Sequence, residues 1–69
     1  METVKIKEEF IRLDSLLKLC NFVSTGGHAK IVIQNGEVKV NGAVCTMRGK
    51  KMRNGDTAEF NGNTVKVTV

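Results

Sequence analysis

STGGHAKIVIQNGEVKVNG, residues 24–42, is the stretch that decides the fold of this chain. Its first half allows two interpretations on local grounds. Three consecutive β-branched residues at 31–33, followed by Asn35-Gly36, favour a strand that pairs with residues 37–40. A hydroxyl cap at Ser24 or Thr25 favours instead a helix over about residues 26–34, closed by Gly36 in the left-handed conformation.

The second half of this stretch predicts a hairpin. Val38 and Val40 alternate with charged residues, and Asn41-Gly42 suits a two-residue type I′ turn. Val44 and Thr46 are expected on the return strand. Alternation or turn signals predict three more strands and two more turns. The strands cover residues 3–7 at an edge, 57–60 and 64–69, and the turns lie at residues 54–56 and at Asn61-Gly62-Asn63.

Upstream, apolar residues with helical spacing predict an amphipathic helix of about two turns. They fall at i, i+3, i+4 and i+7, and are Leu13, Leu16, Leu17 and Cys20. Asp14 and Ser15 suit the start of this helix, and Asn21 suits its end.

Length and composition predict a single domain over residues 1–69. The net charge of +4 is compatible with a polyanionic partner, or with a charge that serves solubility alone. Cys20 and Cys45 are too few for a disulfide framework, and no signal peptide or membrane-spanning stretch is evident. We therefore expect a reduced, cytoplasmic protein with no membrane partner, and leave open whether the two cysteines ever pair.

The strongest functional feature is a basic segment, residues 48–53, with four cations around Gly49, on a loop expected over residues 47–53. Long cationic side chains on such a segment can contact several phosphates, although a solvated turn has the same composition. No Cys-x-x-Cys pair, P-loop or serine–histidine–carboxylate set is present, so no metal, cofactor, small-molecule substrate or catalytic residue is expected. The three phenylalanines are all expected in the core, which favours folded or double-helical RNA over single strands.

The run from Gly26-Gly27 to Val40-Asn41-Gly42, followed by Gly55-Asp56, resembles the S-four RNA-binding domain over about residues 11–60. The chain is most similar to the small stand-alone bacterial members of that family. The resemblance implies an α+β fold, the alpha-L motif, in which two short helices pack on a small, mostly antiparallel sheet. It also implies that residues 24–34 form the second helix, which overrides the β-branched run.

The resemblance implies that the second helix and the adjoining loop bind structured RNA. The residues expected to do so are Arg12, Lys18, Thr25, Gly26, Gly27, His28, Lys30, Lys39, Arg48, Lys50, Lys51 and Arg53. Many members carry an arginine after the helix-start serine, where this chain has Thr25. The roles of two of these residues stay open. His28 could be a surface residue that does not contact RNA, and Arg12 could form an ion pair with Asp14 instead of binding RNA.

These observations predict a monomeric, non-catalytic RNA-binding protein. The resemblance suggests ribosomal RNA or a ribosome-associated particle as the target. The alternative is a protein–protein adaptor whose basic loop binds an acidic partner.

Overall fold

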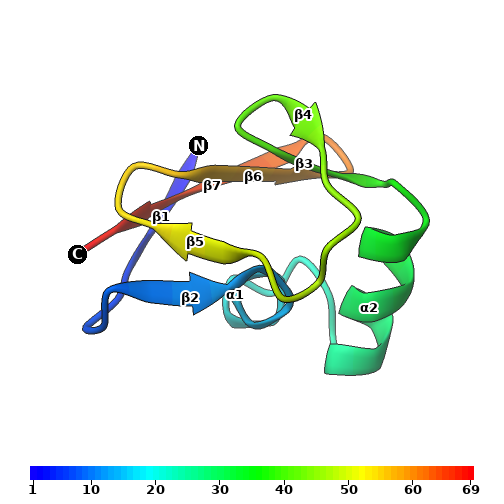
Figure 1. The fold of residues 1–69 in the computed structure, drawn as a ribbon, viewed down its shortest axis with the longest axis horizontal. Helices are drawn as coiled ribbons and strands as arrows, with labels where there is room; N and C mark the ends of the chain where they lie inside the picture. Colours follow the sequence, from blue (N-terminus) through cyan, green and yellow to red (C-terminus); the bar gives the residue numbers. More distant parts are fainter.

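Two helices and two small sheets form the fold in the computed structural model, which describes residues 1–69 (Figure 1). The larger sheet has the strand order β1 (Glu2–Lys5), β7 (Asn63–Thr68), β6 (Thr57–Phe60), β3 (Val38–Val40) and β4 (Ala43–Val44). The smaller sheet pairs β2 (Phe10–Arg12) with β5 (Lys51–Arg53), and the helices are α1 (Leu13–Leu19) and α2 (Gly26–Gln34). The expected class, two short helices on a mostly antiparallel sheet, is confirmed.

The start of α2 agrees with the cap interpretation of the deciding stretch. Thr25 is the N-cap, and its hydroxyl oxygen accepts a hydrogen bond of 3.0 Å from the backbone N–H of His28. Ala29, Val32 and Ile33 form the buried face of α2. Burial of that face stabilises the helix despite the β-branched run, so the strand interpretation is wrong.

The end of α2 is a Schellman motif. Gly36 has φ +78°, and its N–H donates to the carbonyl of Ile33 at 3.0 Å. The N–H of Glu37 donates to the carbonyl of Val32 at 3.0 Å. The left-handed glycine predicted at this position therefore turns the chain from α2 into β3.

Helix α1 begins without a side-chain cap, because the N-cap residue Arg12 makes no such bond. The N–H groups of Leu13 and Asp14 donate instead to the carbonyls of Lys50 and Arg48, at 2.8 and 3.0 Å. The basic segment therefore caps α1 with its own backbone. The helix ends at Leu19 with Cys20 as its C-cap, and Asn21, the predicted end, follows with φ 62°.

The Asn-Gly turns that join the strands of the two hairpins are left-handed at two successive residues, as a type I′ turn requires. The φ values are 51° and 86° at Asn41 and Gly42, and 52° and 81° at Asn61 and Gly62. The return strand of the first hairpin is shorter than expected, because β4 ends at Val44. The edge strand β1 covers residues 2–5 rather than 3–7, and it pairs in parallel with β7.

The two-stranded sheet, here called the ribbon, was not predicted from the sequence. The expected loop continued to Arg53, yet residues 51–53 are a strand paired with residues 10–12. Met52 is fully buried and lies opposite Ile11, which packs against the core. Side chains alternate along a strand, so the burial of Met52 places the cations on either side of it on the outer face.

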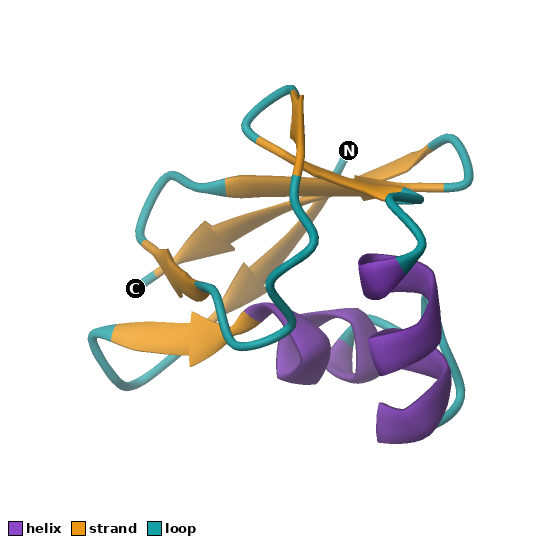
Figure 2. Cartoon of the chain, turned by 45° about the vertical axis from the view of Figure 1, so that its right-hand side comes forward, coloured by secondary structure: helices purple, strands orange, loops and turns teal.

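The core lies between the larger sheet and a second layer made of the helices and the ribbon (Figure 2). All 14 buried residues are apolar. Cys20 packs against this core as predicted, and burial raises the pKa of its thiol. Both cysteines are free thiols. Neither helix is long and apolar enough to cross a membrane.

Candidate nucleic-acid interface

The outer face of the ribbon gathers an aromatic ring and three cations. Its register places Phe10 opposite Arg53 and Arg12 opposite Lys51. These four side chains point away from the buried Met52, because side chains alternate along a strand. The Lys51 Nζ and Arg53 Cζ atoms lie 5.0 and 5.6 Å from the centre of the Phe10 ring, within cation–π range.

Phe10 corrects one expectation from the sequence. Phe22 and Phe60 pack against the core, as predicted, whereas Phe10 is half-buried and not among the core contacts. The alternation of Phe10, Ile11 and Arg12 against Lys51-Met52-Arg53 was the available signal. It was missed because each run is only three residues long and its partner is distant in sequence.

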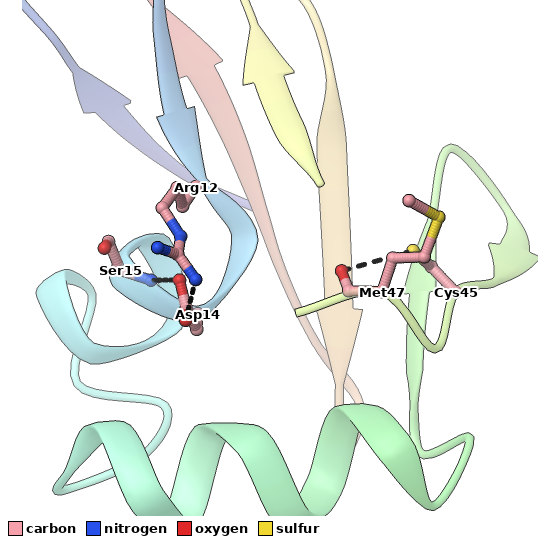
Figure 3. A network of polar contacts seen from close by, with 5 residues as sticks. All are labelled: Arg12, Asp14, Ser15, Cys45 and Met47. Atoms are coloured by element: carbon pink, nitrogen blue, oxygen red, sulfur yellow. Dashed lines mark hydrogen bonds and ion pairs between the residues drawn. The ribbon is translucent and has the colours of Figure 1, made fainter. Parts of the chain in front are cut away.

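Arg12 makes the one ion pair of the structure, with its Nη2 atom 3.1 Å from Oδ2 of Asp14 (Figure 3). The other carboxylate oxygen of Asp14 accepts the backbone N–H of Ser15 at 2.8 Å. Of the two roles left open for Arg12, the structure contains the pairing with Asp14. The pair is exposed on the arginine side, at 52% of the side chain, so the guanidinium remains accessible.

The basic segment runs close to Arg12. A Cβ placed on Gly49 would lie 3.7 Å from the Arg12 Nη2 atom, so the guanidinium lies beside this glycine. All four cations of the segment are exposed and none has an acidic ion-pair partner. We call Arg12 together with Arg48, Lys50, Lys51 and Arg53 the basic strip. Lys50 also borders a hollow of about 390 Å³ beside β4 and Met47.

Asn41 and Asp56 come from the two separate parts of the sequence pattern, residues 40–42 and 55–56, and they lie in contact. The Asn41 side-chain amide donates to one Asp56 carboxylate oxygen at 3.1 Å, and its carbonyl oxygen accepts the Thr57 N–H at 2.9 Å. The other Asp56 oxygen accepts the Arg53 N–H at 2.7 Å. The Arg53 bond, then the Asn41 bond, and also the charges of Lys50 and Arg53, lower the pKa of Asp56. This clamp fixes the end of the basic strip.

The site residues expected on α2 form a separate group. Thr25, Gly26, Gly27, His28 and Lys30 are all exposed. The backbone N–H groups of the two glycines donate no hydrogen bond, as is usual in a first helical turn. In both views α1 lies between the ribbon and α2 (Figures 1 and 2). The basic strip and the α2 group therefore flank α1.

The two remaining expected site residues are Lys39 and Lys18. Lys39 lies opposite Glu59 on the outer face of the larger sheet, because Val38 and Val40 on either side of it are buried. It therefore faces away from the layer that holds the ribbon. Lys18 is exposed in the last turn of α1, one turn beyond Asp14. No group of three or more His, Cys, Asp or Glu side chains is placed as metal ligands.

Fold and surface together define a small α+β module with an exposed cationic edge. The chain belongs to the S4 domain family, whose model matches residues 4–68. This is the S-four family expected from the sequence, and that expectation is confirmed.

Similar proteins are known from several bacteria. YbcJ of Escherichia coli (strain K12), named as a candidate RNA-binding protein, is 43% identical over 61 residues, which are 88% of this chain and 87% of YbcJ. RlbA of Bacillus subtilis (strain 168), named as a probable ribosome maturation protein, is 37% identical over 59 residues, 86% of this chain and 83% of RlbA. The solution structure of YbcJ from E. coli, described as revealing an alpha-L motif involved in RNA binding, has a TM-score of 0.76 and 40% identity. The match covers 100% of this chain and 89% of that one.

Proposed function

We propose that this chain is a non-catalytic module that binds structured RNA along the basic strip. The support for the proposal is a run of five exposed cations on adjoining backbone, of which only Arg12 has an acidic partner. Arg12, Lys51 and Arg53 share the outer face of the ribbon, and the backbone carbonyls of Arg48 and Lys50 contact the first two residues of α1 next to it. Each RNA phosphate that such a run of cations neutralises releases counterions, which favours binding.

The start of α2 serves as a second contact in this proposal. Exposed N–H groups at a helix start attract phosphate, and Lys30 adds a cation nearby on the same helix. The two contacts flank α1, so they suit two segments of folded RNA better than one extended strand. Lys39 faces the other way and is left out of the proposed surface.

The similarity to YbcJ and RlbA supports RNA, and ribosomal RNA in particular, as the partner. YbcJ is described through a motif involved in RNA binding, and RlbA through ribosome maturation. We therefore propose ribosomal RNA or a ribosome-assembly particle as the target. The protein acts as a monomer in this proposal, with no cofactor.

The test compares two double variants with the same change in net charge. Lys51→Glu with Arg53→Glu alters the basic strip, and Lys39→Glu with Lys66→Glu alters the outer face of the larger sheet. Binding to ribosomal RNA fragments is measured by fluorescence anisotropy over a range of salt concentrations. We expect the first variant to lose most of its affinity and to show a shallower salt dependence, by about 0.9 in the log–log slope per lost duplex phosphate contact.

The control variant is expected to bind nearly as well as the parent protein. Equal loss in both variants would mean that only total charge matters, and equal binding by the strip variant would refute the assigned surface. Thermal unfolding of each variant separates a loss of binding from a loss of fold. Displacement of the RNA by an acidic protein, but not by competing structured RNA, would support an adaptor instead.

A further inference from the structure

The largest hollow on the surface borders the ribbon on the side away from β5. It is an open groove of about 420 Å³ between the β1–β2 connection, β2 and α1. This volume lies within the range of about 300–1,000 Å³ that small-molecule sites occupy. Figure 1 shows the three blue-to-cyan segments that border it. The groove is therefore large enough for a single flat, ring-sized group.

The lining of this groove combines an apolar wall with a charged rim. Phe10, Ile11 and Leu19 contribute to the wall. Three cations border it, Lys5, Lys7 and Arg12, against the single carboxylate of Glu8. An aromatic surface beside an excess of positive charge is complementary to a nucleotide, which joins a flat base to a phosphate.

Phe10 links this groove to the basic strip. Phe10 lines the groove, and the centre of its ring lies 5.0 Å from Lys51 Nζ and 5.6 Å from Arg53 Cζ. A nucleotide that entered the groove would therefore have its neighbouring phosphates beside the cations that hold the RNA backbone. The other two phenylalanines, Phe22 and Phe60, pack against the core, so Phe10 is the one phenylalanine ring that this part of the surface offers to a base.

From this arrangement we infer that the groove binds one unpaired RNA nucleotide next to a duplex, with its base against Phe10. The inference rests on the proposed function and makes it more specific. A chain with one platform selects a bulged or overhanging nucleotide, whereas a single-strand binder needs several platforms in a row.

The test uses two RNA hairpins that differ by a one-nucleotide bulge in the stem. Stacking of one base contributes about 1–3 kcal/mol, so the parent protein should bind the bulged hairpin about five- to 150-fold more tightly. Phe10→Leu should bind both hairpins equally, at the parent's affinity for the plain stem. A preference that survives in Phe10→Leu would overturn the inference.

A second pair of variants controls for folding and for charge. Leu19 and Val44 are apolar side chains with nearly equal exposure, 57% and 58%, but only Leu19 borders the groove. Leu19→Glu should reduce the preference for the bulge at least fivefold, because it places a carboxylate in the groove, and Val44→Glu should leave the preference unchanged. Equal effects of the two changes would count against the groove.

A direct signal comes from Phe10→Trp, because the chain has no other Trp and no Tyr. Stacking of a base on this indole should quench its fluorescence with the bulged hairpin and not with the plain one. If the parent protein binds both hairpins equally, or the Trp signal is the same with both, the groove assignment fails while RNA binding stands. If the parent binds neither hairpin, both proposals fail.

Discussion

The two hairpins of the larger sheet pair strands that are close in sequence, whereas the ribbon pairs strands that are far apart in sequence. Strands β3 and β4 are joined by Asn41-Gly42, and β6 and β7 by Asn61-Gly62. The strands of the ribbon, by contrast, are separated by residues 13–50. A two-residue turn specifies its hairpin locally. Closing a long loop costs conformational entropy, and tertiary contacts have to offset that cost.

The ribbon obtains these contacts from the core and from α1. Met52 is fully buried, and the backbone of the basic segment accepts hydrogen bonds from the first two residues of α1. The cations of the proposed interface therefore depend on packing, while the outer face of the larger sheet presents its charges on locally specified strands. The edge that carries the proposed interface is therefore more easily destabilised than the two hairpins.

Met52→Ala should have the largest effect and should break the ribbon first. Removing most of a fully buried methionine side chain typically costs about 2–5 kcal/mol of unfolding free energy. Chemical denaturation measures this loss, and amide exchange should show residues 10–12 and 51–53 opening before the hairpin turns. Met47→Ala is the matched control, because Met47 is 66% exposed and should change stability by less than about 0.5 kcal/mol.

The same contrast explains how far the sequence could predict this molecule. Asn41-Gly42, Asn61-Gly62 and Gly36 are local signals, and each turn formed as expected. The β-branched run in α2 was ambiguous locally, and the resemblance to a family resolved it. The ribbon was missed because its evidence is two three-residue runs far apart in the chain.

The residues of the candidate site also divide into those that local sequence predicts and those whose position depends on strand pairing. The basic segment was predicted from composition alone, and its cations are exposed. Lys39 was grouped with it as a cation on a neighbouring element, but strand alternation turns Lys39 to the opposite face. Phe10 was assigned to the core because aromatic residues are usually buried, and only its pairing with β5 reveals its position beside the cations.

Gly36→Val should have the next largest effect, and it tests the locally specified region. The residue has φ +78°, a conformation that costs a side-chain-bearing residue about 1–2 kcal/mol. The added Cβ would lie 3.6 Å from Val44 Cγ1, an ordinary contact, so the cost comes from the backbone. Gly26→Ala should have the opposite sign, because that glycine is helical and its Cβ position is open. Equal thermal stabilities of the two variants would contradict this account.

The smallest effect is expected at Asp56, which connects the ribbon to the larger sheet. Its carboxylate accepts bonds from Arg53 in β5 and from Asn41 in the turn of the larger sheet. Asp56→Asn leaves one acceptor oxygen in place of two, so one of these bonds is lost. At neutral pH we expect a loss of about 1 kcal/mol of unfolding free energy, since the carboxylate is partly exposed.

Acid should remove the same contribution from the parent protein. The pKa of Asp56 is lowered from its ordinary value of 3.8 in the folded state, chiefly by the Arg53 N–H bond, so folding favours the ionised carboxylate. Its contribution is therefore complete above pH 3.8 and is lost as the pH falls through the lower, folded-state pKa. Denaturation curves of the parent and Asp56→Asn should differ at pH 6 and converge in strong acid. A difference that stays constant with pH would show that the charge of Asp56 does not stabilise the junction between the ribbon and the larger sheet.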